Sequence, residues 1–176
     1  MTVVATTAGE LLLRPVEPAD LPLLAAWMND PAVAAFWELD GPAERTALHV
    51  RRELDAGNAT NLGLLDGVPM SYWEVYPAER DRLAEHYPAE PGDTGLHLLL
   101  GPAPYRGRGL GAVLLAAVAE DLLRGAPRVV AEPDVRNTAS IRAFQRAGFT
   151  AVREIDLPEK RAALMVRERA RPQGTV

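Results

Sequence analysis

The first candidate for chemistry is a histidine at the head of an apolar stretch that runs into a glycine- and arginine-rich turn. The stretch is "HLLLGPAPYRGRGLGAVLLAAV", residues 97–118. Strand alternation puts His97 on the same face as Leu99, and Leu98 and Leu100 on the other. A polar group among leucines needs a reason, and an imidazole exchanges a proton near neutral pH. His97 is therefore a candidate for proton transfer, with a hydrogen-bonded structural histidine as the alternative.

The turn that follows has the features of an anion site. Its residues are Arg106, Gly107, Arg108, Gly109, Leu110 and Gly111. Glycines let the backbone approach a ligand, and a helix that begins near Gly109 leaves its first N–H groups unpaired. Phosphate binding is favoured over a flexible loop before an ordinary helix. The P-loop's Gly-Lys-Ser/Thr is absent, and Gly111 arrives one residue early for a dinucleotide fingerprint.

Acidic and aromatic residues elsewhere are candidates for the rest of a site. Asp134 ends the next expected strand, where it would orient the His97 imidazole or act as a base itself. The proposed acceptor-binding group, suited to an alkyl amine with a cationic end, consists of Trp37, Tyr72, Trp73, Glu74 and Asp81. Core packing is the alternative for the tyrosine or Trp73, and a solvated surface role for the two acids.

Some side chains receive no site role from the pattern. His49 and His86 are interpreted as surface histidines, and no cluster has metal-ligand spacing, so no metal is expected. The chain has no cysteine, which excludes disulfides, thiolate metal sites and cysteine nucleophiles.

The length and composition indicate one compact domain. The 176 residues are 48% hydrophobic, enough for one sizeable core. A net charge of -5 argues against nucleic acid as a main partner. Neither a signal peptide nor an apolar run long enough to cross a bilayer is found, so no membrane partner and a cytoplasmic location are expected.

The elements that must position these residues follow from periodicity and turn chemistry. We expect helices over 18–30, 41–57, 109–124 and 137–147, and a short helical piece over 31–39. Strands are expected over 10–17, 95–101 and 127–133, with hairpins over 60–76 and 149–168. The polar segment 77–94 is expected to be a functional loop or lid. This order predicts an α/β (α+β) fold with a mixed sheet, bounded as a domain over 10–169, with flexible ends at 1–9 and 170–176.

Two of these segments resemble one superfamily, the GCN5-related N-acetyltransferases (GNAT). "YRGRGLGAVLL" is similar to its pyrophosphate-binding segment, and "NTASIRAFQRAGF" (137–149) to its second signature. The resemblance implies a single GNAT domain with a mostly antiparallel sheet of about seven strands, splayed at the acyl-CoA site. It also implies cofactor contacts, beyond the turn, from Leu99, Leu100, Asn137, Ser140 and Phe144.

The resemblance narrows to the siderophore hydroxylamine acyltransferases of the aerobactin, mycobactin and desferrioxamine pathways. It rests on "DPAVAAFW", "PMSYWEVYPAERD", "GLHLLLGP" and "RVVAEPDVRNTASIRAFQRAGF". It implies transfer from acetyl-CoA, succinyl-CoA or another acyl-CoA to the hydroxylamine nitrogen of an N-hydroxylated lysine or diamine. It also implies that His97 and Asp134 are active-site residues, and the protein is expected to be a monomer or homodimer.

Two alternatives stay open. One is an aminoglycoside 6'-N-acetyltransferase or another small-amine acetyltransferase, where an aspartate is expected in place of His97. The other is a non-catalytic acyl-CoA-binding module. Phe144 stands where many members of the superfamily have a tyrosine, and phenylalanine cannot protonate the departing thiolate.

Overall fold

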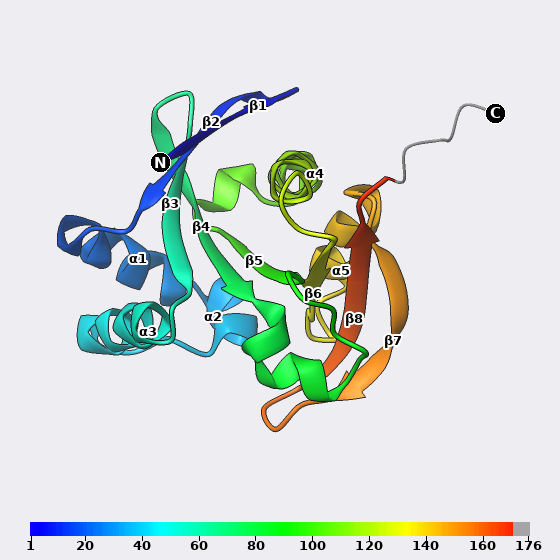
Figure 1. The fold of residues 1–176 in the computed structure, drawn as a ribbon. Helices are drawn as coiled ribbons and strands as arrows, with labels where there is room; N and C mark the ends of the chain where they lie inside the picture. Colours follow the sequence, from blue (N-terminus) through cyan, green and yellow to red (C-terminus); the bar gives the residue numbers. More distant parts are fainter. Residues whose placement is uncertain (171–176) are drawn as a thin grey trace.

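One open sheet organises the molecule. The computed structural model describes residues 1–170, and the sheet order is β1-β2-β3-β4-β5-β6-β8-β7 (Figure 1). The strands are β1 (Thr2–Thr6), β2 (Gly9–Pro15), β3 (Ala59–Leu65), β4 (Val68–Pro77), β5 (Thr94–Leu100), β6 (Arg128–Ala131), β7 (Thr150–Asp156) and β8 (Arg161–Glu168). Neighbours are antiparallel except β5 and β6. The predicted α/β fold with a mixed, mostly antiparallel sheet is confirmed.

The prediction of a flexible N-terminus over 1–9 is wrong. Thr2–Thr6 forms an edge strand on β2, so the sheet has eight strands rather than about seven. The segment "TVVAT" is rich in β-branched residues, and Val4 packs into the core beneath the hairpin. The predicted tail lies outside the described residues from position 171 onward.

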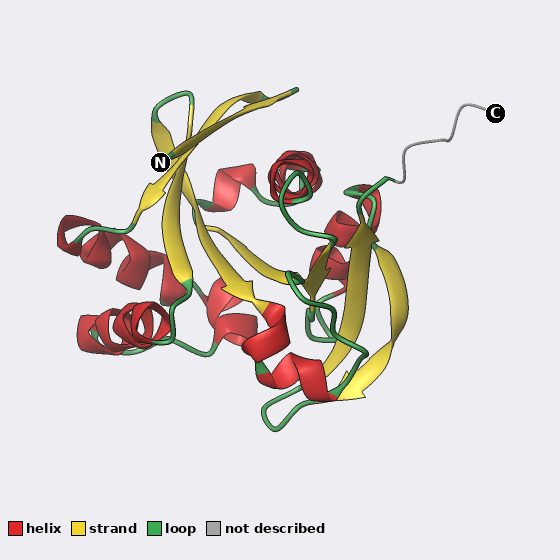
Figure 2. Ribbon diagram, in the orientation of Figure 1, coloured by secondary structure: helices red, strands yellow, loops and turns green. Residues whose placement is uncertain are grey.

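Helices cover both faces of the sheet (Figure 2). They are α1 (Leu21–Met28), α2 (Pro31–Trp37), α3 (Ala43–Asp55), α4 (Leu110–Leu122) and α5 (Thr138–Arg146). The first three pack around Tyr72 and Leu99 on one face. The last two pack around Trp73 and Leu96 on the other. Alternate residues of β4 and β5 thus face opposite cores, as the pleat requires.

Short turns complete the connections. They are η1 (Pro18–Asp20), η2 (Ala78–Arg80), η3 (Arg82–Glu85) and η4 (Ala103–Tyr105). The β3–β4 hairpin turns at Asp66 and Gly67, both with positive φ, as the Asp-Gly pair predicts.

The segment expected as a loop over 77–94 carries η2 and η3 and has a core of its own. Leu83 and Tyr87 are buried beside β8 residues. Arg128 anchors the end of the segment, because its Nη2 lies 2.5 Å from Asp93 Oδ2 and its guanidinium stacks on Tyr87. The segment is therefore folded onto the sheet rather than loose.

The sheet opens between its two parallel strands. β5 and β6 pair only at Thr94 with Val129 and at Gly95 with Val130. Beyond Gly95, β5 continues to Leu100 with β4 as its only partner strand among residues 1–170. This is the expected splay, and it leaves backbone groups of β5 free at the end where the glycine turn begins.

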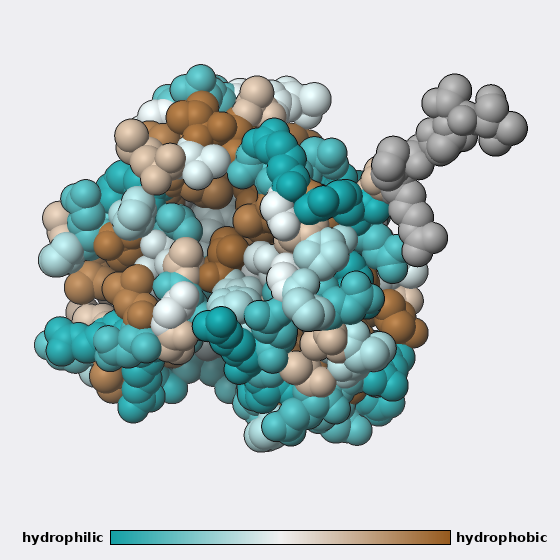
Figure 3. All heavy atoms as spheres, in the orientation of Figure 1, coloured by the Kyte–Doolittle hydropathy of each residue, from teal (hydrophilic) through white to brown (hydrophobic). Residues whose placement is uncertain are grey.

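Apolar residues gather at the centre and upper part of the face in Figure 3, and hydrophilic residues cover most of the rest. Among residues 1–170, no helix has the length and apolar character that a membrane span requires.

Candidate active site

A cavity of about 450 Å³ lies at the opening of the sheet. Of the residues predicted from the sequence, the cavity is lined by Trp37, Glu74, Asp81, His97, Asp134, Asn137, Ser140 and Phe144. The predicted Leu99 and Leu100 do not line it, whereas their neighbour Leu98 does. His49 and Glu132 also line it. Residues from both halves of the chain meet here because β4, β5 and the end of β6 are adjacent in the sheet.

His97 lies between two buried carboxylates. Its Nδ1 is 3.0 Å from Glu74 Oε2 and its Nε2 is 2.6 Å from Glu132 Oε1. The two glutamate side chains are only 5% and 4% exposed, whereas that of His97 is 30% exposed. Both ring nitrogens of His97 are therefore used by carboxylates, and part of the ring faces the cavity.

Strand register explains this arrangement. Glu74 is directly opposite His97 in the β4–β5 ladder. Gly95 of β5 pairs with Val130 of β6. His97 comes two residues after Gly95, and Glu132 comes two residues after Val130. The two side chains therefore lie level with each other just beyond the last β5–β6 pair.

Gly95 has a packing role in the same arrangement. A Cβ at Gly95 would lie 2.0 Å from the ring of Tyr76, so the tyrosine lies directly over the glycine. From there the Tyr76 hydroxyl donates to Glu132 Oε2 at 2.8 Å. Glycine at 95 thus lets Tyr76 hold the second oxygen of Glu132.

The network fixes the charge of His97. Burial lowers the pKa of His97, but the attraction of Glu132 and Glu74 outweighs it and raises the pKa to about 10. Burial raises the pKa of Glu74 and Glu132, but hydrogen bonds and charges of the histidines outweigh it and lower each to about 2. The two carboxylates therefore favour the imidazolium form of His97 at neutral pH, whereas a histidine that exchanges its proton near neutrality was expected.

Asp134 lies in the same cavity but does not pair with His97. Its Oδ2 is 2.6 Å from Arg136 Nη2, and its Oδ1 accepts from the Arg136 backbone N–H at 2.7 Å. The hydrogen bond from Arg136 lowers the pKa of Asp134. The expected contact between Asp134 and His97 is therefore not formed: β6 ends at Ala131, and Asp134 lies beyond it in an isolated bridge to Ala162 of β8. A catalytic role for Asp134 stays a prediction.

His49 was expected at the surface and instead lies in the cavity wall. Its Nε2 is 2.5 Å from Glu74 Oε1, on the carboxylate oxygen that His97 does not use. His49, Glu53 and Glu74 each place one ligand atom within 4.8 Å of the others. The His49–Glu74 distance is that of a hydrogen bond, which accounts for the grouping without an ion. The sequence signal was weak, since a lone histidine on a helix does not reveal its partner.

Two of the predicted acceptor-binding residues are core residues. Trp73 is fully buried on the α4 side of the sheet, and its Nε1 donates to Ser71 Oγ at 2.8 Å. Tyr72 is also fully buried, and its hydroxyl donates to Glu74 Oε1 at 3.0 Å. Neither side chain is accessible to an acceptor, so these two predictions are wrong for direct contact. Tyr72 holds Glu74 in place instead.

Trp37 forms an aromatic wall of the cavity. Its ring centroid is 6.3 Å from that of His97, edge to face, and 5.7 Å from that of Tyr72. Asp81 also lines the cavity, and its carboxylate accepts from the Leu83 backbone N–H at the start of η3. Both residues are placed where an acceptor can contact them.

The glycine turn has the backbone that the sequence predicted. Gly107 and Gly109 have φ of 73° and 80°, and Gly109 is the N-cap of α4. A Cβ on either glycine would meet no atom of the described residues within 4 Å. A Cβ on Gly111 would lie 3.5 Å from Leu100 and 3.9 Å from Ala143, which joins the turn to β5 and α5. The start of α4 thus offers open backbone N–H groups to an anion.

Arg106 is held by protein groups in this structure. Its Nη2 lies 2.6 Å from Asp30 Oδ2 and 2.7 Å from the Gly101 carbonyl oxygen. The hydrogen bond from Arg106 helps to lower the pKa of Asp30 to about 2. A contact between Arg106 and pyrophosphate stays a prediction, as do the contacts expected of Arg108 and Leu110.

The second signature segment positions α5 at the cavity. Asn137 is the N-cap of α5, and its Oδ1 accepts from the Ser140 backbone N–H at 3.0 Å. Phe144 is buried against Phe149, with ring centroids 5.0 Å apart. The Phe144 ring therefore packs in the core, and it has no proton to donate to a departing thiolate.

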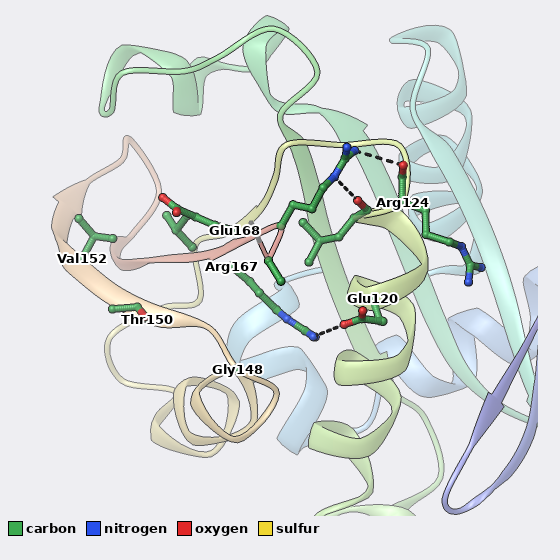
Figure 4. Close-up of a pocket in the computed structure, with 11 residues that line it drawn as sticks. Glu120, Arg124, Gly148, Thr150, Val152, Arg167 and Glu168 are labelled. Atoms are coloured by element: carbon green, nitrogen blue, oxygen red, sulfur yellow. Dashed lines mark hydrogen bonds and ion pairs between the residues drawn. The ribbon is translucent and has the colours of Figure 1, made fainter. Parts of the chain in front are cut away.

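A larger hollow of about 830 Å³ lies at the far end of α4 (Figure 4). Its arginines are engaged by the protein. Arg167 pairs with Glu120, and Arg169 donates to the carbonyl oxygens of Leu123 and Ala126 at the end of α4. We assign the chemistry to the smaller cavity, which holds the buried carboxylates and borders the opening of the sheet.

Comparison with known proteins agrees with this geometry. The family model described as an acetyltransferase (GNAT) domain matches residues 17–157. The N(6)-hydroxylysine O-acetyltransferase of Escherichia coli is 36% identical over 90% of this chain and 52% of its own length. The lysine N-acyltransferase MbtK of Mycobacterium tuberculosis H37Rv is 35% identical over 89% of this chain and 76% of its own. The N-hydroxyputrescine acetyltransferase of Acinetobacter baumannii is 34% identical over 84% of this chain and 72% of its own length.

Solved structures match as well. An uncharacterized protein from Bacillus halodurans superimposes with a TM-score of 0.89 and 37% identity, over 95% of this chain and 89% of that one. Aminoglycoside acetyltransferase AAC(6')-Ib in complex with coenzyme A superimposes with a TM-score of 0.82 and 25% identity, over 90% of this chain and 95% of that one.

The fold and the matched residues place the chain in the GNAT acetyltransferase family. Among its relatives are acyltransferases named for hydroxylated lysine and putrescine, which confirms the narrower resemblance. The chain spans about half the length of the E. coli relative.

Proposed function

We propose that this protein transfers an acyl group from an acyl-CoA to the hydroxylamine nitrogen of an N-hydroxylated lysine or diamine. The observation that carries the proposal is the Glu74–His97–Glu132 network at the opening of the sheet, on the strand that leads into the glycine turn. The names of the relatives support the hydroxylamine as acceptor and the siderophore pathway as its setting. The cytoplasmic location and the monomeric or homodimeric state remain predictions.

The acyl-CoA would lie along the open edge of β5. Its pyrophosphate would accept hydrogen bonds from the N–H groups at the start of α4, around Gly109. Backbone groups around Leu99 and Leu100, which have no β6 partner, would hold the pantetheine arm and the thioester oxygen. The acetyl, succinyl or longer acyl chain would then point into the cavity.

The charges around the cavity favour an acceptor with a cationic end. The two basic residues that line the cavity both have acidic partners. Arg82 pairs with Glu159, and Lys160 Nζ lies 3.8 Å from Glu132 Oε1. The Asp81 and Glu53 carboxylates make hydrogen bonds to neutral groups only, among residues 1–170. Together with Trp37 they suit an alkyl chain that ends in an ammonium group.

A hydroxylamine suits this site because it is less basic than an alkyl amine and is largely neutral near pH 7. Its nitrogen attacks the thioester carbon, the new C–N bond forms and the C–S bond breaks. The nitrogen gives up one proton, and coenzyme A leaves as the thiolate, which takes a proton from solvent. The imidazolium of His97 would contribute fixed positive charge beside the reacting carbonyl.

Steady-state rates with acetyl-CoA test the proposal. N-hydroxy-1,5-diaminopentane and N6-hydroxylysine should each be acylated at least about tenfold faster than the parent diamine and lysine at pH 7, since only the hydroxylamines are mostly neutral. Equal or reversed rates, or turnover of kanamycin above that of the hydroxylamines, would instead favour a small-amine or aminoglycoside acetyltransferase. Binding of acyl-CoA without turnover of any acceptor would indicate a non-catalytic module.

A further inference from the structure

The two histidines of the cavity differ in whether a ring nitrogen is free. His97 uses both nitrogens, at 3.0 Å to Glu74 and 2.6 Å to Glu132. His49 uses only Nε2, at 2.5 Å to Glu74. Among residues 1–170, His49 Nδ1 makes no hydrogen bond, and it is partly exposed rather than buried, on a side chain that is 21% exposed and lines the cavity. Only a nitrogen with a free lone pair can take a proton.

The elements around His49 fix its orientation. Its helix α3 places Thr46 and Val50 in the protein interior, and His49 lies beside them at the cavity. The carboxylate that holds Nε2 is itself held, because Glu74 Oε1 also accepts from the Tyr72 hydroxyl. Glu74 therefore selects the tautomer with hydrogen on Nε2 and leaves Nδ1 as an acceptor. A carboxylate behind an imidazole is the arrangement by which many enzymes orient a general base.

We propose that His49 is the general base of acyl transfer, with Glu74 as the residue that positions it. This inference rests on the proposed function. The N–H bond of the attacking hydroxylamine nitrogen breaks, and its proton forms a bond with His49 Nδ1. The resulting imidazolium stays paired with Glu74 and returns the proton to solvent after coenzyme A leaves. His97 remains protonated throughout, since both of its nitrogens are held by carboxylates.

The charges that face His49 determine the pH at which it can act. Burial lowers the pKa of His49, but Glu74 on β4 and Glu53 on the same helix outweigh it and the pKa is raised, while the positive charge of His97 on β5 opposes them. The neutral form of His49 is therefore reached above the ordinary value for histidine. The rate should rise with pH through this shifted value, and substrate binding should not follow the same curve.

Three variants of the whole chain test the assignment with acetyl-CoA and N-hydroxy-1,5-diaminopentane. His49→Ala should lower kcat about 10²–10⁴-fold and lose the rising limb of the pH profile. His49→Gln keeps an N–H for Glu74 but has no base, so it should show the same loss. His86→Gln removes the histidine that does not line the cavity and should retain wild-type kcat. CoA affinity, measured by calorimetry, should be unchanged in all three.

Added imidazole gives the second measurement. Millimolar imidazole should restore part of the rate of His49→Ala, because the shortened side chain leaves room for it, and should not restore His49→Gln. Wild-type kcat and an intact rising limb in His49→Gln would overturn the inference and reduce His49 to a hydrogen-bond donor for Glu74. If the wild-type protein acylated no hydroxylamine, the proposed function itself would be contradicted. The two failures are therefore distinguishable.

Discussion

At the scale of single residues, the site depends on carboxylates that the protein buries and then neutralises with histidine. A buried carboxylate without a partner costs several kcal/mol, so Glu74 and Glu132 require the cation between them. The same contacts remove His97 from the set of free bases. One network therefore stabilises the site and decides which histidine is available for proton transfer.

Gly109 gives the prediction that belongs to this scale. Gly109→Ala should raise the dissociation constant of CoA about tenfold or more, because a side chain at the N-cap of α4 would crowd an anion held by the first N–H groups of that helix. Isothermal titration calorimetry with CoA measures the effect. Gly67→Ala is a matched control, since Gly67 has φ +81 and no neighbour within 4 Å, close to Gly109 at +80. Equal affinity in the two variants would contradict pyrophosphate binding at this turn.

At the scale of elements, the Arg106–Asp30 pair joins the glycine turn to α2. Asp30 is the N-cap of α2, accepting from the Ala32 backbone N–H at 2.9 Å, and α2 ends at Trp37 in the cavity wall. Arg106 also donates to the carbonyl of Gly101 at the end of β5. The arginine thus links the glycine turn and the end of β5 to the helix that carries Trp37.

Removing either partner of this pair should affect the acceptor. We expect Asp30→Ala and Arg106→Ala each to raise KM for the hydroxylamine about two- to fivefold, as an ion pair near the surface predicts. The double variant should show less than the product of the two effects, because they share one interaction. Asp40→Ala, which removes an exposed acid that makes no ion pair among residues 1–170, is the control. Weaker CoA binding in Arg106→Ala but not in Asp30→Ala would show in addition that Arg106 contacts the pyrophosphate, as the sequence predicts. Unchanged KM for the hydroxylamine in both single variants would contradict the link to the acceptor.

At the scale of the whole molecule, the network makes stability depend on pH in two directions. The pKa of His97 is raised from 6.5 to about 10, so its contribution is complete below 6.5 and is lost as pH rises toward 10. The pKa of Glu74 and Glu132 falls from 4.5 to about 2, so their contribution is complete above 4.5 and is lost as pH falls toward 2. The network contributes most between these ranges.

Chemical unfolding from pH 4 to pH 10 tests this dependence. The wild-type free energy of unfolding should be greatest between about pH 4.5 and 6.5 and should decline toward pH 10. His97→Gln should be less stable at pH 6 and should lack most of the alkaline decline, because glutamine does not titrate. A variant curve parallel to the wild-type curve above pH 6.5 would show that His97 is not held as a cation.

The sequence alone predicted the local features of this protein. The glycines of the turn, the Asp-Gly hairpin and the alternation that separates His97 from Leu98 are properties of neighbouring residues, and each is present in the structure. The superfamily was also visible from two short segments, because the backbone conformations they encode are local. The edge strand over Thr2–Thr6 was missed because it is short and stabilised by pairing with β2.

Only the tertiary structure decided which side chains meet in the cavity. Glu74 lies opposite His97 because β4 and β5 pair in antiparallel register. Glu132 reaches His97 because β5 and β6 pair in parallel as far as Gly95 and Val130. Asp134 is two residues further on, and its carboxylate is held by Arg136. His49 comes from a helix on another part of the chain. Partners of a buried charge are set by strand register and helix docking, which involve residues far apart in the sequence.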